Sequence, residues 1–420
     1  MQRYRLIQGY PGCNADRFKI QDADGRLYVR YPEETCYAAG VWHDYAWSFN
    51  FGLQNTSAEK VDVEVFVNCR SPDECPPEPF ILYTSRDPIK GFEPAAALGR
   101  SDGYSKYYFI ATIPAGETVY FSNTMPRDYE TFINSLAVKA RAHGVSQQPA
   151  GWTVEGRQIQ AFVFGDLHNG KPNLLYTSGF HPAEGDSYAV EAVFDHLCGG
   201  SGRRWLRDFN VVLIPAANPD GFVHGTNGAN LNGVNLYWNF AHEDKDRAPE
   251  AYSLWRYFRE IKPVLYVDFH AYVTQPKKKM SPYVKPAGLY AGSRVRDIVK
   301  EMDAFLIGFS RGRFHSGYLT YARTTLAYLL TRDFNTITYT KFHFHLRNGV
   351  SVVQEQAVRI FDGLAEILKE HGVSHAGDVL LKPAGFIERS VGEKLCLRFL
   401  VAREELKNPL RQLRAALLRT

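Results

Sequence analysis

Cysteine is scarce in this sequence and does not occur in the patterns that bind metal or form disulfide frameworks. Six cysteines are spread over 420 residues, at positions 13, 36, 69, 75, 198 and 396. They include no Cys-x-x-Cys pair and no cluster with histidine, which excludes a cysteine-ligated zinc site and a small disulfide-stapled domain. We expect ordinary buried thiols in a reducing compartment.

The sequence also lacks the long apolar segments and the charge excess that direct proteins to membranes or nucleic acids. No stretch reaches 18 consecutive apolar residues, and the first ten residues lack the apolar run of a secretory signal. The 49 Lys and Arg against 45 Asp and Glu leave a net charge of only +4, and the basic residues are dispersed. The lysines at 277–279 are more typical of a solvated loop than of a binding patch. We predict a cytoplasmic protein with no membrane and no nucleic-acid partner.

Apolar and aromatic residues, by contrast, are plentiful enough for a full core. Apolar residues make up 45% of the chain, with 27 Phe and 25 Tyr, while 34 Gly and 22 Pro are near-average numbers. This composition excludes a disordered or fibrous chain. At about 150 residues per domain, the length predicts two or three domains.

The N-terminal third shows apolar residues at every second position. The alternation is clearest at Tyr45, Trp47, Phe49, Phe51 and Leu53, at Val61, Val63, Val65 and Val67, and in residues 107–113 and 118–122. A period of two places such side chains on one face of a strand. Because Gly, Pro and Asn turns separate these short strands without an intervening helix, we predict an antiparallel β-sandwich domain at residues 1–148.

Strand-like apolar runs alternate with amphipathic helices in the rest of the chain. The runs lie at residues 160–164, 173–178, 211–215, 264–269 and 336–342, and helical patterns at 127–144, 187–198, 295–309 and 351–370. Such alternation favours an α/β fold with a mostly parallel, doubly wound mixed sheet. We place this catalytic domain at residues 149–375, after a polar link at 145–151, and assign no role to a C-terminal extension at 376–420.

Polar residues follow two of these predicted strands, at the edge where open α/β sheets bind ligands. The run at 173–178 leads into His181-Pro-Ala-Glu184, and the run at 264–269 ends at His270. An imidazole and a carboxylate three residues apart on a turn can converge on one cation, and a second imidazole gives the three protein ligands of a catalytic zinc. A His-x-x-Glu string alone arises often by chance, so the prediction rests on the position of both histidines at strand ends.

Together with two further strings, these residues resemble the zinc carboxypeptidase family. The strings are His181-Pro-Ala-Glu184, Asn218-Pro-Asp-Gly221, Gly233-Val-Asn-Leu and Asp268-Phe-His270, in the family's order and roughly its spacing. The cytosolic carboxypeptidase subgroup, which has a β-sandwich before its catalytic domain, is the most similar. The resemblance implies a carboxypeptidase-like fold and one zinc ion per chain, held by His181, Glu184 and His270, with Asp268 as a candidate to orient His270. The same ligands also suit iron, cobalt or manganese.

Three functions of that family fall on residues that cannot perform them. The general-base glutamate corresponds to Thr340, whose hydroxyl has no pKa near neutrality. The Asn-Arg pair that captures the terminal carboxylate corresponds to Tyr237 and Trp238, and aromatic rings do not replace a bidentate arginine. The oxyanion-stabilising arginine falls near Gly228, and no Lys or Arg lies between positions 207 and 245. Ordinary cleavage of C-terminal residues from peptides is therefore disfavoured.

Two functions from different classes remain. The first is a zinc-dependent, carboxypeptidase-like hydrolase of atypical specificity. It cleaves an amide or ester bond in a small-molecule or peptide-like substrate that offers an apolar face to Tyr237 and Trp238. The alternative is a catalytically inactive carboxypeptidase-like protein that binds zinc or a ligand. The sequence leaves the identity of the substrate and the oligomeric state open.

A hydrolase with Thr340 in place of glutamate needs another base. His343 and His345 have a suitable pKa range, although regular strand alternation places them on the face opposite Thr340. Arg323 is a candidate contact for an anion, while a surface salt bridge is the more typical role of such a residue.

Overall fold

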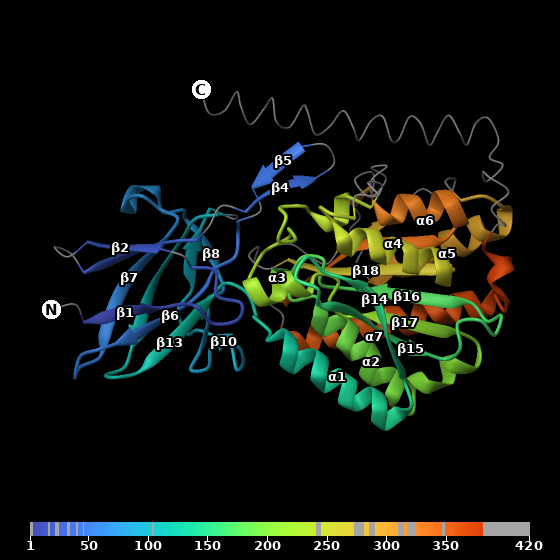
Figure 1. Cartoon of the computed structure of the whole chain (residues 1–420), viewed down its shortest axis with the longest axis horizontal. Coiled ribbons are helices and arrows are strands. Elements are labelled where there is room, and N and C mark those ends of the chain that lie inside the picture. The colour runs from blue at the N-terminus through green and yellow to red at the C-terminus, as the bar shows by residue number, and fades with distance from the viewer. Residues whose placement is uncertain are drawn as a thin grey trace.

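The chain forms two β-sheets at its N-terminal end and a larger sheet flanked by helices (Figure 1). The computed structural model describes residues 3–15, 17–21, 25–31, 34–38, 41–44, 46–102, 105–240, 245–272, 281–284, 290–309, 315–316, 325–346 and 349–380. Of residues 17–21, 35–38, 41–44, 272, 281–284, 315–316, 341–343 and 345 it describes the backbone alone.

In the described residues of the N-terminal part, thirteen strands form two larger sheets and one separate two-stranded sheet. They are β1 (Tyr4–Ile7), β2 (Arg17–Gln21), β3 (Arg26–Arg30), β4 (Thr35–Ala38), β5 (Val41–Asp44), β6 (Asn50–Asn55), β7 (Val61–Val67), β8 (Glu78–Phe80), β9 (Tyr83–Ser85), β10 (Glu93–Pro94), β11 (Gly99–Ser101), β12 (Tyr107–Ile113) and β13 (Thr118–Ser122). One sheet has the order β1-β6-β13-β9-β10 and the other β2-β3-β7-β12-β11-β8, while β4 pairs with β5. The pairings within both larger sheets are antiparallel except that of β3 with β7.

One apolar core joins the two N-terminal sheets. It contains the alternate valines of β7, the inward residues of β12 and apolar residues of β6 and β13. The ring of Phe109 in β12 lies 5.6 Å from that of Phe49 and 6.3 Å from that of Phe51 in β6. The period of two predicted these strands and their buried faces, although residues 46–49 of the alternation precede the strand, which begins at Asn50.

The larger sheet has eight strands in the order β14-β15-β17-β16-β18-β21-β19-β20. The strands are β14 (Ser146–Trp152), β15 (Gln158–Phe164), β16 (Asn173–Thr177), β17 (Asn210–Ile214), β18 (Leu265–Tyr272), β19 (Ser281–Val284), β20 (His315–Ser316) and β21 (Ile337–His345). The α-helices are α1 (Tyr129–His143), α2 (Ser187–Cys198), α3 (Pro219–His224), α4 (Pro249–Ile261), α5 (Ser293–Phe309), α6 (Leu326–Phe334) and α7 (Val350–Glu370). Strands β17, β16, β18 and β21 are parallel neighbours, and β14, β15 and β19 pair antiparallel, so the predicted mixed α/β sheet is confirmed.

Helices cover both faces of this sheet, which explains its continuous apolar runs. Leu174 and Tyr176 of β16 pack in a core with α1, α2, α5 and α7, whereas Leu175 between them packs in a core with α4 and α6. Figure 1 shows α2 and α7 on one side of the sheet and α4 and α6 on the other. The carboxyl ends of the parallel strands therefore provide an edge for a site.

Residues 146–152 form the edge strand β14, where the sequence predicted a link. The pairing of β14 with β15 is irregular between Pro149 and Gly151, and an edge strand tolerates proline at such a bulge. The expected boundary at residues 148 and 149 thus lies inside a strand. The division into domains stays a prediction, and residues 381–420 of the expected C-terminal extension lie outside the described residues.

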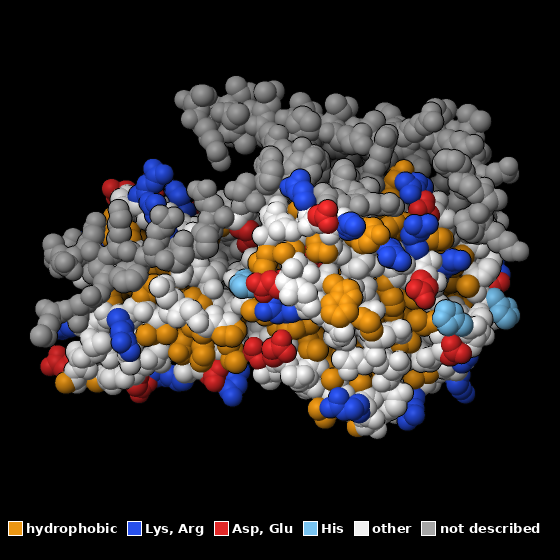
Figure 2. All heavy atoms as spheres, in the orientation of Figure 1, with side chains coloured by type: hydrophobic (Ala, Val, Ile, Leu, Met, Phe, Trp, Pro, Cys, Tyr) orange, Lys and Arg blue, Asp and Glu red, His pale blue; other side chains and the backbone are white. Residues whose placement is uncertain are grey.

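The distribution of surface charge and the state of the cysteines agree with what the composition predicted. Figure 2 shows Lys and Arg interspersed with Asp and Glu on the drawn face. Cys13, Cys69, Cys75 and Cys198 are free thiols. Across the described part of the chain, no helix combines the length and apolar character needed to cross a bilayer. The three lysines at 277–279 lie outside the described residues.

Candidate metal centre

Two neighbouring parallel strands bring the predicted ligands to the same sheet edge. Thr177, the last residue of β16, pairs with Asp268 of β18, and His270 lies two residues further along β18. The chain leaves β16 through Gly179, which has a φ of +71° and where a side chain would meet a neighbouring atom at 2.8 Å. This turn requires glycine. It leads directly to His181, which therefore faces the end of β18.

His181, Glu184 and His270 converge on one point. One potential ligand atom from each residue lies within 4.8 Å of the others, and all three residues are buried. The Nδ1 atom of His181 lies 2.9 Å from Oε1 of Glu184, and Nδ1 of His270 lies 2.8 Å from Oε2. The backbone N–H of Ala271 also donates to Oε2, at 3.0 Å. Two imidazole nitrogens and a carboxylate thus offer the donor types that zinc prefers.

A second oxygen stands behind each imidazole ring. Oδ2 of Asp268 lies 2.7 Å from Nε2 of His270, and the Thr177 hydroxyl donates to the other Asp268 oxygen at 3.0 Å. Oδ1 of Asn235 lies 3.4 Å from Nε2 of His181. Such outer partners orient an imidazole and leave its other nitrogen for a metal. Asp268 therefore lies where the sequence expected it, and the residues present fit a divalent metal ion.

The charges of the cluster also suit a cation. Burial alone would raise the pKa of Glu184, but His270 and His181 hold that pKa well below its usual value. Burial opposes protonation of His270, yet Asp268 and Glu184 raise its pKa to about 10. The cluster therefore stabilises positive charge between its rings, and a bound metal ion would take the place of protons there.

Thr340 and Tyr237 lie together beside the imidazole of His270. Strand β21, which carries Thr340, lies next to β18, and the Tyr237 hydroxyl donates to the Thr340 hydroxyl at 3.1 Å. The Tyr237 ring stands at 90° to the His270 ring, with 5.5 Å between centroids, and packs at 4.9 Å against Trp238. Tyr237 is 1% exposed, Trp238 6% and Thr340 1%. Hydroxyls and buried aromatic rings therefore lie beside the His270 imidazole.

Gly228, the position expected for an oxyanion arginine, binds a carboxylate of its own chain. Its backbone N–H donates to Oε1 of Glu34 at 2.7 Å. Glu34 belongs to no motif or periodic pattern, so no signal in the sequence indicates this contact. Its position before β4 is far from Gly228 in the sequence.

The base candidates from the sequence lie partly outside the described residues. The backbone register is Val267 with Tyr339, Phe269 with Phe342 and His270 with His343. An extra residue in β21 therefore interrupts the pairing, and the simple alternation that separated position 343 from Thr340 does not hold across it. The side chains of His343 and His345, and the whole of Arg323, lie outside the described residues.

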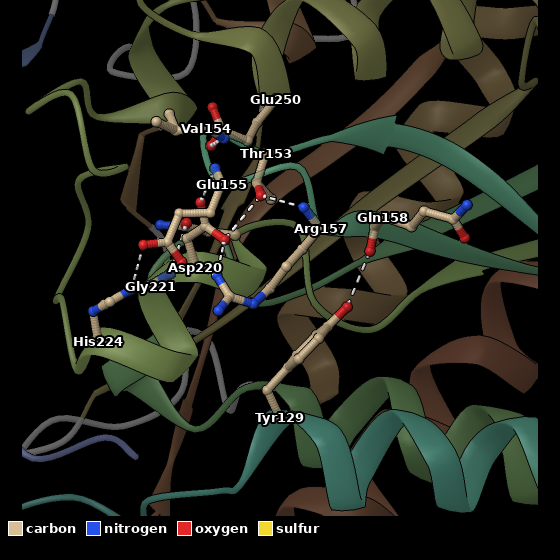
Figure 3. Close-up of polar contacts among 11 residues, drawn as sticks. Tyr129, Thr153, Val154, Glu155, Arg157, Gln158, Asp220, Gly221, His224 and Glu250 are labelled. Atoms are coloured by element: carbon tan, nitrogen blue, oxygen red, sulfur yellow. Dashed lines mark hydrogen bonds and ion pairs between the residues drawn. The ribbon is translucent and has the colours of Figure 1, made fainter. Parts of the chain in front are cut away.

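The Asn218-Pro-Asp-Gly221 string holds the architecture in place (Figure 3). Asp220 is fully buried and accepts hydrogen bonds from the Thr153 hydroxyl at 2.8 Å, from Arg157 at 2.6 Å and from the Glu155 backbone at 3.0 Å. The Asn218 amide donates to the carbonyl of Ala229 at 3.0 Å. The string therefore ties α3 to the β14–β15 turn and to the loop that follows α3.

Comparisons with known proteins support the resemblance to zinc carboxypeptidases. Residues 130–277 match the family model for zinc carboxypeptidase. Cytosolic carboxypeptidase 1 of Xenopus laevis is 29% identical to this chain over 110 residues, and that of Gallus gallus is 26% identical over 110 residues. Each match covers 24% of this chain and only 9% of the relative. The predicted resemblance to the zinc carboxypeptidase family is confirmed.

Solved structures of metallo-carboxypeptidases share the fold over most of the chain. One from Burkholderia cenocepacia has a TM-score of 0.64 at 16% identity and covers 87% of this chain and 99% of that chain. One from Pseudomonas aeruginosa, in complex with (2-guanidinoethylmercapto)succinic acid, has a TM-score of 0.67 at 16% identity and covers 87% of this chain and 100% of that chain. The carboxypeptidase-like fold class is therefore confirmed.

Proposed function

We propose that this chain is a zinc-dependent hydrolase that cleaves an amide or ester bond other than the C-terminal peptide bond. The convergence of His181, Glu184 and His270 within 4.8 Å carries the proposal. Three protein ligands are typical of catalytic zinc, whereas structural zinc sites usually have four. The described residues offer three. One zinc ion per chain is the expected content.

The roles of the surrounding residues follow from their contacts. Zinc bound at this site would act as a Lewis acid and activate water for attack on a carbonyl. Glu184 supplies the negative charge, because its pKa is held low. Asp268 holds Nε2 of His270 at 2.7 Å and so keeps Nδ1 directed at Glu184. These residues prepare the centre without contributing a base.

The residues beside His270 support an altered substrate. Tyr237 and Trp238 carry no positive charge to capture a terminal carboxylate, and Gly228 uses its N–H to bind Glu34. The match of residues 130–277 to a family of peptidases supports a small-molecule or peptide-like substrate. For the base, His343 and His345 remain the candidates, since the backbone of His343 pairs with that of His270. A cytoplasmic location stays part of the proposal.

Metal analysis and a turnover screen test the proposal. We expect the purified full chain to contain about one zinc ion and a His181→Ala/His270→Ala double variant to contain none. Metal-dependent turnover of at least one N-acyl amino acid, peptide, amide or ester is then expected, and it should fail in a His343→Ala/His345→Ala variant that still binds zinc. Absence of metal from the unmodified chain contradicts any zinc function. Rapid release of C-terminal residues from ordinary peptides contradicts the altered specificity.

A second function, zinc binding without turnover, is favoured by one contact. The hydrogen bond between Tyr237 and Thr340 joins two buried residues at the positions of the family's anchoring pair and base. In that case the chain binds zinc with the same ligands but hydrolyses none of the screened substrates.

A further inference from the structure

A carboxylate from the residue just before β4 is bound by the loop after α3. The backbone N–H and side-chain amide of Asn227 donate to Oε2 of Glu34 at 2.5 and 2.7 Å. The backbone N–H groups of Gly228 and Ala229 donate to Oε1 at 2.7 and 2.8 Å. Successive N–H groups directed at one anion form a nest, which is a general way to bind carboxylate or phosphate. We call residues 227–229 the carboxylate nest.

The carboxylate nest is connected to a metal-ligand partner by a tight turn. Ala229 forms an antiparallel bridge with Asn235, and the Asn230 N–H donates to the carbonyl of Val234 at 2.9 Å. Asn235 places its Oδ1 atom 3.4 Å from Nε2 of His181. The nest and the residue behind His181 are therefore joined by one short turn of chain.

The same turn is held from its other side by buried groups of the α/β part. Oε2 of Glu250 in α4 accepts from the Asn230 amide at 2.9 Å, and the Asn218 amide donates to Ala229. Glu34 thus holds this turn from the side that faces the N-terminal strands. The strand after it, β4, lies next to the short turn Leu236–Trp238 that carries Tyr237.

Glu34 is held in this place against a desolvation cost. Burial raises the pKa of Glu34, while the donors of the carboxylate nest oppose that rise. A buried carboxylate is tolerated only where hydrogen bonds replace its water. The four donors provide that replacement, and without Glu34 three buried N–H groups and an amide would lack their acceptor.

We infer that Glu34 is a positioning residue of the metal centre, which acts by holding the carboxylate nest and, through it, Asn235 against His181. The inference rests on the proposed zinc site for its effect on metal affinity. It also gives the N-terminal strands a role: they supply one anion that completes a loop of the α/β part.

Chemical rescue tests this role. We expect Glu34→Ala to weaken zinc binding by the full chain about 10-fold, the lower end of the effect of removing an outer partner of a ligand. Sodium acetate should restore most of that affinity, because acetate can occupy the carboxylate nest, whereas sodium chloride at the same ionic strength should not. Glu64→Ala is the matched control: Glu64 accepts from Arg26 and Tyr108 within the N-terminal strands and should show neither effect. If Glu34→Ala does not fold, Glu34→Gln takes its place; because the glutamine side chain still occupies the nest, zinc affinity and hydrogen exchange are then compared with the unmodified chain without acetate.

Hydrogen exchange separates this inference from the proposed function. Residues 227–235 should exchange faster in Glu34→Ala than in the unmodified chain and slow again with acetate, whether or not metal is present. Unchanged zinc affinity in Glu34→Ala, an equal loss in Glu64→Ala, or failure of acetate to restore affinity would overturn the inference. If the unmodified chain binds no zinc, the proposed function fails, and the exchange experiment alone decides the role of Glu34: exchange that is unchanged, or that acetate does not slow, overturns it.

Discussion

The α/β part of the chain contains two buried acidic clusters, one around Glu184 and one around Asp220, and their partners differ in kind. Asp220 receives hydrogen bonds from the Thr153 hydroxyl, the Arg157 guanidinium and the Glu155 backbone N–H, each of which donates to it. The two oxygens of Glu184 instead face imidazole nitrogens, each of which can give up its proton and bind a metal. Both clusters contain residues of family-like strings.

The difference between the two clusters shows how a structural acid is told from a ligand. A carboxylate whose partners all donate to it, none of them a metal-binding group in that role, is already satisfied by hydrogen bonds. A carboxylate between two imidazoles, with further oxygens behind the rings, has partners that a metal can bind in common with it. The Asp220 cluster should therefore govern stability, and the Glu184 cluster metal binding.

Removal of the Asp220 carboxylate should have the largest effect, and on stability alone. Asp220→Ala leaves the Thr153 hydroxyl and the Glu155 N–H without their acceptor and breaks the contact with Arg157, and each lost buried partner costs about 1–3 kcal/mol. We expect unfolding free energy to fall by about 3 kcal/mol or more in denaturant melts, with near-normal zinc affinity in the folded protein. Asp195→Ala, at an exposed pair with Lys139, should change stability by less than about 0.5 kcal/mol. A large loss of zinc affinity in Asp220→Ala would show that the Asp220 cluster also governs metal binding, and the distinction between the two clusters would fail.

Glu184→Gln should have the opposite profile. The amide keeps the shape of the side chain but removes the charge between His181 and His270, and we expect zinc affinity to fall by more than about 100-fold, beyond the effect of losing an outer partner. Chelator competition measures this affinity. Zinc should raise the melting temperature of the unmodified chain, as any ligand specific to the folded state does, and should not raise that of Glu184→Gln at the same concentration. Equal stabilisation of both proteins by zinc would remove Glu184 from the ligand set.

Asp268→Asn should show an intermediate effect on the metal. The amide no longer accepts strongly from His270, so the ring loses the charge that orients it, and zinc affinity should fall about 10- to 100-fold. Thr177→Val is the graded control, because the Thr177 hydroxyl supports Asp268 from behind at 3.0 Å and should cost less affinity. A larger loss in Thr177→Val than in Asp268→Asn would show that Asp268 does not act through His270.

The sequence predicted the metal side of the site because its logic is local and topological. His181 and Glu184 share one turn, and His270 lies near the carboxyl end of the neighbouring parallel strand β18, so the rule for parallel sheets was enough to bring them together. The apolar runs also predicted the central strands, since they are buried on both faces. Edge strand β14 was missed because Pro149 and Gly151 are typical of loops, and only the irregular pairing with β15 accommodates them.

Other parts of the site depend on contacts that no pattern records. Glu34 meets residues 227–229 across nearly two hundred positions of chain, and Asp220 meets Thr153 across 67. The register irregularity in β21 changes which residues lie beside His270. The sequence of β21 contains no glycine or proline that would indicate an irregularity. These contacts arise from packing of whole elements, which periodicity within one element does not encode.

The smallest expected effect comes from the hydrogen bond between Tyr237 and Thr340. Thr340→Val keeps the shape of the side chain and removes the acceptor of the Tyr237 hydroxyl, so stability should fall by about 1 kcal/mol while zinc affinity stays unchanged. A double-mutant cycle with Tyr237→Phe isolates the contact. The stability lost in the double variant should be smaller than the sum of the two single losses by a coupling energy of about 0.5–1.5 kcal/mol. If turnover is found in the screen, it should persist in Thr340→Val, because the hydroxyl is not a base. Loss of turnover with intact zinc binding would instead place Thr340 in the reaction, together with the residues that bind the metal.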